Sequence, residues 1–360
     1  MRRNLPTLVF LIAINAFAGP IMNGGRGMLH VKSAMGTRPK QLWATWQSRA
    51  WGEAADVQYF SDGVVTRTTF WDVQGVMSLN YGVLPHLSLS MSTVIYQDVN
   101  TEGPDDLFGD TSLDIRTGNY QIQNTNAYVG LNLGLRFPTG SYHNILFEEY
   151  TAGTTEAGLT GLFTYRYKLP NLAFDYRIHV NLTYWNYFDK GARLVAGDEF
   201  REISVVKKNS QAFYYGFGLE FPTTLFDYGL EFYGLSWITF PPPAAGGREN
   251  FLYMNMSFGY KPHPRFKFYT ALDLRLSKDV DYTQGPRRTF SQLDNYPGWR
   301  VYLGVRAMIL PKSLYDMYRQ ALIEAQSLRT KSSAKKTTQS APKTQSKPSG
   351  QTAPQQPKKE

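Results

Sequence analysis

Five histidines and no cysteine limit the catalytic and metal chemistry that this 360-residue chain could carry. A hydrolytic site needs a nucleophile beside a histidine that a third group orients. His179, close to Asp175 in the chain, is the candidate for such a group, and we interpret it instead as part of a hydrogen-bond network. No His-x-x-x-His pair occurs, and the acidic segment 99–110 lacks the ligand spacing of an EF-hand loop. We therefore expect a protein that is not an enzyme, with no catalytic residue, no metal site and no cofactor.

Charged side chains instead fall on the polar face of segments that alternate apolar and polar residues. In segment 171–188, Ile178 and Val180 fall on one face, whereas Arg177 and His179 fall on the other. A period of two is that of a β-strand, because successive side chains point to opposite faces of a sheet. Strands with one apolar and one polar face must therefore position these charges.

Twelve such segments follow one another between Gln41 and Leu310, and short and long connections alternate between them. The first, 41–56, does not sort cleanly into two faces, because of Trp43, Trp46, Arg49 and Trp51. Each segment is at least as long as the roughly 9–11 residues that a tilted strand needs to cross a membrane. Tight turns at one end and long loops at the other are typical of a transmembrane β-barrel. The predicted strands are 41–56, 65–82, 86–98, 109–118, 125–138, 157–169, 171–188, 210–223, 225–240, 250–261, 265–280 and 297–310. The expected fold is all-β, a transmembrane antiparallel β-barrel of about 12 strands, or about 14 if residues 28–36 also pair.

The aromatic residues indicate which face meets lipid. If the strands run up and down in order, aromatic side chains gather near both ends of the apolar face, with aliphatic ones between them. Those at the short-turn end are Tyr81, Tyr167, Phe174, Phe221, Tyr228, Tyr260 and Phe266, and those at the long-loop end are Trp71, Phe137, Tyr184, Tyr215 and Trp299. Two aromatic belts are what the two interfaces of a bilayer select. The apolar face should therefore meet lipid.

The polar face should then line the lumen, where both signs of charge are interspersed. The predicted lumen-lining residues are Asp114, Arg116, Arg136, Arg166, Asp175, Arg177, His179, Glu220, Glu231, Lys267, Asp273, Arg275, Arg300 and Arg306. Two functions remain open. The charges can line a narrow channel for small molecules, or they can pair across the lumen of a non-conducting, structural or anchoring barrel. Gly130, Gly134, Gly216 and Gly218 on the same face should leave room for a solute, which favours the channel.

The segments outside the barrel carry signals for export. Residues 1–18 predict a secretory signal peptide, with two arginines before its apolar run and a small-x-small cleavage site at its end. Residues 19–40 form a glycine-rich arm that enters the periplasm or the lumen. Residues 311–329 repeat apolar side chains with helical spacing and predict a periplasmic amphipathic helix, and the Lys-rich residues 330–360 predict a disordered tail. We expect the barrel, residues 41–310, to lie in a bacterial outer membrane with both termini in the periplasm.

The net charge of +9 describes the tail rather than the barrel. Residues 330–360 contribute +6 and the signal peptide contributes +2, which leaves +1 for the other residues. This balance argues against a nucleic-acid-binding surface. The expected partners are outer-membrane lipid and a small-molecule solute, and a lysine-rich tail can also contact the anionic cell wall.

Three stretches resemble one known family of barrels. They are GDTSLDIRTG at 109–118, AYVGLNLGLRFPTG at 127–140 and GLTGLFTYRYKLPNLAFDYRIHVNLTY at 158–184. The Gly-Asp strand opening and the Pro-Thr-Gly hairpin end are similar to those of the outer-membrane β-barrel family linked to the meta-pathway of phenol degradation. The resemblance, over about residues 109–184, implies a barrel that passes aromatic or other hydrophobic compounds.

Overall fold

The structure, a computed structural model, describes residues 26–58, 65–99, 108–140, 143–145, 147–168, 175–195, 203–243, 245–277 and 295–310. The predicted signal peptide, the predicted helix at 311–329 and the predicted tail at 330–360 lie outside these residues. Within the described ranges, no helix is both long and apolar enough to cross a membrane.

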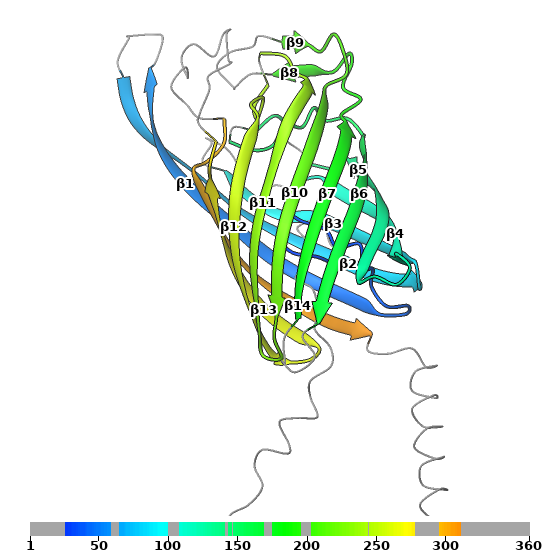
Figure 1. Cartoon of the computed structure of the whole chain (residues 1–360). Coiled ribbons are helices and arrows are strands. Elements are labelled where there is room, and N and C mark those ends of the chain that lie inside the picture. Colours follow the sequence, from blue (N-terminus) through cyan, green and yellow to red (C-terminus); the bar gives the residue numbers. More distant parts are fainter. Residues whose placement is uncertain are drawn as a thin grey trace, which may run out of the picture. The chain divides into compact units, whose positions relative to one another are not determined.

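Twelve antiparallel strands close into one barrel (Figure 1). In chain order they are β1 (Leu42–Gln58), β2 (Val65–Leu84), β3 (Leu87–Val99), β4 (Thr111–Gln121), β5 (Ala127–Phe137), β6 (Glu156–Lys168), β7 (Asp175–Asn186), β10 (Gln211–Pro222), β11 (Phe226–Thr239), β12 (Phe251–His263), β13 (Phe266–Arg275) and β14 (Trp299–Leu310). Each strand pairs with the next barrel strand in the chain, and the pairing of β1 with β14 closes the sheet. Every one of these strands falls on a predicted segment, so the predicted antiparallel barrel is confirmed.

Two further strands were not predicted. β8 (Arg193–Val195) and β9 (Ile203–Val205) form a separate two-stranded sheet within the connection from β7 to β10. A strand of three residues is too short to show a period of two, which is why the sequence did not reveal this pair. Figure 1 shows it among the long loops.

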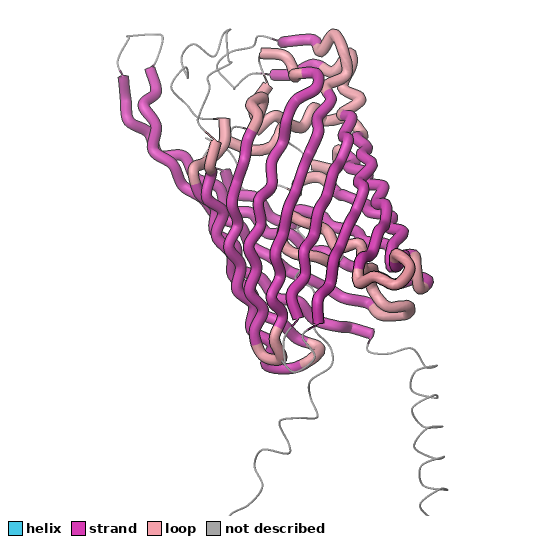
Figure 2. The backbone as a smooth tube through the Cα atoms, viewed as in Figure 1, coloured by secondary structure: helices cyan, strands magenta, loops and turns pink. Residues whose placement is uncertain are grey.

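The connections alternate in length as expected, and the strands form one wall with loops gathered at its ends (Figure 2). The tightest turns consist of Pro85 and His86 between β2 and β3, and of Pro264 and Arg265 between β12 and β13. Proline suits these positions because it fixes its own φ and cannot donate to a strand ladder. The long loops interlock at the opposite end, where the Gly246 N–H donates to the Asn144 side chain at 2.5 Å.

The outward face of the barrel is apolar. Leu131, Leu182 and Leu303 are exposed on it along the strands. The exposed aromatic side chains include, from the predicted belts, Tyr81, Phe221, Tyr228 and Tyr260 at the short-turn end and Phe137, Tyr184 and Trp299 at the long-loop end, whereas Phe217 lies exposed between the two ends. The predicted belt residues Trp71, Tyr167, Tyr215 and Phe266 are partly exposed. An apolar band between two aromatic belts is the surface of a transmembrane β-barrel.

The inward face is polar and buried. Strand β1, whose predicted segment did not sort cleanly into two faces, follows the same rule: Gln47, Arg49 and Trp51 are buried, whereas Trp46 is exposed. Tryptophan occurs on both faces of β1, and this hid the alternation in the sequence. The barrel therefore encloses a continuous lining of polar side chains.

Candidate functional site in the barrel lumen

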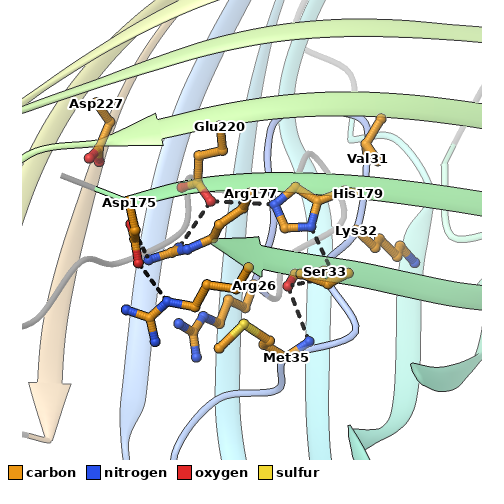
Figure 3. Close-up of polar contacts among 12 residues, drawn as sticks. Arg26, Val31, Lys32, Ser33, Met35, Asp175, Arg177, His179, Glu220 and Asp227 are labelled. Carbon is orange, nitrogen blue, oxygen red and sulfur yellow. Dashed lines mark hydrogen bonds and ion pairs between the residues drawn. The ribbon is translucent and has the colours of Figure 1, made fainter. Parts of the chain in front are cut away.

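Residues 26–37, called the arm below, lie inside the barrel and bind side chains on its inner wall (Figure 3). The arm turns back on itself at its tip. Gly27 and Lys32 form an isolated antiparallel bridge, and the Met28 N–H donates to the Val31 carbonyl at 2.9 Å. Only a few residues separate the arm from β1. The tip of the arm can therefore reach only those wall positions that lie within this short length of chain.

Glu231 of β11 holds the tip of the arm. Its carboxylate is fully buried and accepts hydrogen bonds from three consecutive backbone N–H groups, those of Leu29 (2.8 Å), His30 (2.8 Å) and Val31 (2.7 Å). Successive N–H groups that converge in this way form an anion-binding concavity. Charge-assisted bonds are roughly twice as strong as neutral ones. Glu231, near the middle of its strand, therefore fixes the tip at mid-lumen.

The His30 side chain connects the tip to a second buried carboxylate. Its ring stacks on Tyr233 with centroids 3.7 Å apart, and its Nε2 lies 3.2 Å from Asp273 Oδ1 on β13. Asp273 also accepts hydrogen bonds from the hydroxyls of Tyr233 (2.6 Å) and Tyr302 (2.7 Å) and from the Asn255 amide (2.7 Å). Side chains from β11, β12, β13 and β14 thus meet the arm at one carboxylate.

The middle of the arm is bound by β4 and β7. The Asn181 amide contacts the Lys32 backbone twice, accepting from its N–H at 2.5 Å and donating to its carbonyl at 2.7 Å. The Lys32 ammonium group lies 2.6 Å from Asp114, which also accepts from Asn132 at 2.6 Å. Buried backbone groups need such partners, and here side chains of the wall supply them.

His179 lies in a buried network that joins the arm to an ion pair (Figure 3). Its Nδ1 lies 2.9 Å from the Thr164 hydroxyl, which accepts from the Ala34 N–H at 2.8 Å. Its Nε2 lies 3.4 Å from Glu220, and Glu220 pairs with Arg177 at 3.0 Å. Both ring nitrogens therefore have polar partners, which is the hydrogen-bond network expected from the sequence.

The base of the arm is held by β4. The Gly36 N–H donates to the Asn119 side chain at 2.9 Å. The Arg116 guanidinium donates to the carbonyls of Arg26 (2.7 Å) and Ser33 (3.3 Å), and so links the two legs of the arm. Specific contacts therefore hold the arm along its whole length, and it forms a plug.

Glycines on β10 make room for the plug. A Cβ atom at Gly216 would lie 2.9 Å from the Val31 side chain, and one at Gly218 would lie 2.5 Å from the Met28 sulfur. The sequence suggested that these glycines leave space for a solute. That interpretation is wrong for these two positions, because arm side chains occupy the space.

The predicted lumen residues lie on or near the inner wall, and most of them form ion pairs. The buried ones are Asp114, Arg116, Asp175, Arg177, His179, Glu220, Glu231, Lys267, Asp273, Arg300 and Arg306. The side chain of Arg275 is buried, whereas those of Arg136 and Arg166 are partly exposed. Further ion pairs join Arg136 to Glu156, Arg166 to Asp175, Lys267 to Asp227 and Arg275 to Glu249. Arg300 and Arg306 lie over the rings of Tyr253 and Trp43 at 4.8 and 4.6 Å.

A cavity of about 320 Å³ lies between the arm and the long loops, and it is called the vestibule below. Leu29, His30 and Lys32 of the arm line one side of it. Inward side chains of the strands form its walls, and Glu148 and Glu149 of the β5–β6 loop line it from the loop end. The lumen is therefore filled by the arm near mid-height and open between the arm and the long loops.

The β5–β6 loop crosses the barrel mouth and contacts β1. Glu148 lies 2.6 Å from Arg49, and Phe147 packs on Trp51 with ring centroids 5.1 Å apart. Burial alone would raise the pKa of the Glu148 carboxyl, but the Arg49 and Arg300 guanidinium groups outweigh burial and hold that pKa below its ordinary value. Glu148 is therefore a carboxylate at neutral pH, and its charge holds the loop.

Sequence reasoning did not find how the arm binds. Leu29 and Val31 contact Glu231 through backbone N–H groups, which every residue except proline carries. The signal that could have been used is the pair Gly216 and Gly218, because two glycines on one inward face leave space for a backbone or side chain from elsewhere. Their partner could not be read from the sequence.

The fold and the lumen together define a class of protein: a transmembrane β-barrel whose lumen is plugged by its own N-terminal segment. Among the residues that the structure describes, no group of histidine, aspartate or glutamate side chains is arranged to hold a metal ion.

No protein-family model matches the chain, and no curated protein matches it. An outer membrane channel from Pseudomonas putida F1 is similar in structure at 10% sequence identity and a TM-score of 0.47, over 77% of this chain and 98% of that one. The NanC porin has 10% identity and a TM-score of 0.42, over 73% and 98% of the two chains. The translocator domain of the autotransporter NalP from Neisseria meningitidis has 9% identity and a TM-score of 0.43, over 76% and 90%. These likenesses concern the barrel and say nothing about what crosses this one.

Proposed function

We propose that this protein is an outer-membrane channel for small molecules, closed at rest by its arm. The observation that supports this best is that a segment of the chain, and not the wall of the barrel, obstructs the lumen. A tethered segment, residues 26–37, obstructs the lumen at mid-height, and a vestibule of about 320 Å³ lies on one side of it. Barrels of intermediate strand number enclose a lumen whose use depends on what fills it. Displacement of the arm would connect the vestibule with the short-turn end.

The proposed orientation follows from the lengths of the connections. Outer-membrane barrels place short turns in the periplasm and long loops outside. Both barrel ends, at Leu42 and Leu310, would then lie on the periplasmic side, because an even number of antiparallel strands brings the two ends to the same side of the barrel. In this orientation the vestibule opens toward the cell exterior and the arm enters from the periplasm.

The alternative is a non-conducting barrel with a structural or anchoring role. Paired charges in the lumen, such as Arg177 with Glu220, favour it, since paired groups do not need a passing ion or solute. In that case the arm is a permanent plug. The Lys-rich residues 330–360, which lie outside the described part of the chain, would then act by binding the anionic cell wall.

Single-channel recording in planar bilayers separates the two functions. We expect brief openings from the full chain and sustained conductance after deletion of residues 26–36. Heat-modifiable gel migration would verify that the deletion variant still forms a barrel, and Glu231→Ala replaces the deletion if it does not. If none of these proteins conducts, and none admits solutes into liposomes, the channel is refuted and the structural barrel is supported.

A further inference from the structure

The vestibule has two chemically different walls. Strands β2 to β6 contribute amides and hydroxyls to it, namely Gln74, Ser92, Ser112, Asn132 and Thr160. Strands β7 to β12 contribute the amide of Asn181 and the hydroxyl of Thr183, and also four aromatic rings, namely Trp185, Tyr214, Tyr233 and Phe251. A pocket of this kind, mostly apolar on one side with placed polar groups on the other, is typical of a small-molecule site. A channel could pass small molecules without a polar or an aromatic wall of this kind, so these walls call for a separate explanation.

Trp185 is fixed as a flat surface at the junction of the two walls. Its ring covers Gly134 and Gly158, and a Cβ atom at Gly134 would lie 3.0 Å from the ring carbon Cζ3. The indole N–H donates to Glu156 at 2.8 Å, and Glu156 is buried and paired with Arg136. The ring also lines the vestibule, where the Arg136 guanidinium carbon lies over it, 6.0 Å from the ring centroid.

Polar groups lie next to this ring along the same strands. Asn132 and Thr160 are register partners, directly beside the partners Gly134 and Gly158 that the ring covers. The Asn132 Oδ1 atom is buried, and within the described chain it has no hydrogen-bond partner. An acceptor that is buried without a partner is costly, and here it lines a cavity. A ligand with hydroxyl donors would satisfy it.

The lysine and arginine side chains that line the vestibule are paired with carboxylates. Lys32 lies 2.6 Å from Asp114, Arg49 lies 2.6 Å from Glu148, and Arg136 is paired with Glu156. Cations held by carboxylates in this way have little attraction left for an anionic ligand. The carboxylates of Asp110 and Glu149, which also line the vestibule, would repel an anion. The other polar groups of the lining are amides and hydroxyls, which both donate and accept hydrogen bonds.

From this geometry we infer that the vestibule binds a neutral sugar of mono- or disaccharide size. A pyranose ring has an apolar C–H face, which would pack on the part of the Trp185 ring that lines the vestibule. Its hydroxyls both donate and accept, and would bond to Asn132 and Thr160. A cavity of about 320 Å³ is at the small end of ligand pockets, in keeping with one or two sugar rings. The inference deepens the proposed function, because such a sugar would be the solute that the channel passes.

Titration calorimetry on the full chain in detergent tests the site without requiring conduction. We expect saturable binding of maltose, and weaker or no binding of galacturonate and phenol, which carry a negative charge and an aromatic ring respectively. Trp185→Ala should weaken maltose binding at least tenfold, and Trp185→Phe should weaken it by less. Thr160→Val, which keeps the shape of the side chain, should weaken it severalfold. Trp46→Phe, on the exposed outer face, is the matched control and should bind as the unaltered protein does.

Folding of each variant is checked by heat-modifiable gel migration. The inference is overturned if maltose does not bind, if phenol or galacturonate binds more tightly, or if folded Trp185→Ala and Thr160→Val bind maltose normally. Conductance without maltose binding would overturn the sugar site and leave the channel standing. Maltose binding by a barrel that never conducts would overturn the channel and leave the sugar site standing.

Discussion

Replacement of Glu231 by alanine should release the tip of the arm. The substitution removes the acceptor of three buried N–H groups, those of Leu29, His30 and Val31. A buried donor that loses its partner costs about 1–3 kcal/mol. Even about 1 kcal/mol for each group gives about 3 kcal/mol, which corresponds to about a hundredfold larger population of the released arm.

The absence of cysteine from the chain permits a direct assay of this release. Ser33 of the arm is buried inside the barrel, and Ser33→Cys introduces a single thiol of nearly the same shape. The rate at which a membrane-impermeant thiol reagent modifies this cysteine measures how often the arm leaves its site. We expect that rate to rise about a hundredfold when Glu231→Ala is added, since about 1.4 kcal/mol is a factor of ten.

Asp227→Asn is the matched control for this assay. Asp227 is a buried carboxylate on the same strand, and it binds Lys261 (2.6 Å) and Lys267 (2.8 Å) rather than the arm backbone. Its loss should leave the labelling rate of Ser33→Cys within a few-fold of the parent. Equal acceleration by both substitutions would mean that the whole wall has loosened, and no acceleration by Glu231→Ala would show that the three hydrogen bonds do not hold the plug.

Three other outcomes are expected. Gly218→Leu should displace the Met28 side chain, which lies 2.5 Å from the added Cβ, and raise channel conductance, whereas Gly161→Leu, where the nearest atom lies at 3.9 Å, should not. Leu182→Arg places a cation on the lipid face and should destabilise the barrel by about 2–4 kcal/mol in urea unfolding, with Leu182→Phe nearly neutral. The Glu148 carboxylate, next to Arg49, Asp72 and Arg300, has a lowered pKa. Its stabilisation of the loop is therefore complete above the ordinary value of 4.5 and is lost as pH falls through the lower folded value. Hydrogen exchange at residues 147–151, corrected for intrinsic rates, should stay slow at pH 5 and accelerate only in stronger acid, and Glu148→Gln should accelerate it at neutral pH.

The sequence predicted the wall of the barrel far better than its contents. Alternation at positions such as Ile178 and Arg177 is a local property, and it recurs in every strand regardless of what lies inside. The contacts of the arm depend instead on partners distant in the chain: Val31 meets Glu231, and Lys32 meets Asn181. Lumen charges such as Glu231 and Asp273 were identified by type, but their partners were not.

The walls of the vestibule show the same limit. Trp185 and Asn132 each fit an ordinary barrel strand, and nothing local distinguishes a ring that faces a cavity from one that fills a core. Only the closure of the sheet brings β5, β6 and β7 around one space. The β5–β6 loop could likewise be predicted as long, while its contact between Glu148 and Arg49 could not.

The position of the arm in the chain also constrains the order in which the molecule can be built. The arm precedes β1, yet the Leu29 N–H donates to Glu231, a residue 202 positions later. Contacts between residues this far apart in sequence form late, because the entropy lost in closing the long intervening loop must be offset before the contact stabilises the fold. The last strand, β14, must also pair with β1 to complete the wall. The N-terminal residues must therefore remain within reach of the interior while the other strands are added, so that insertion of the plug and closure of the seam become one coupled, late event in assembly.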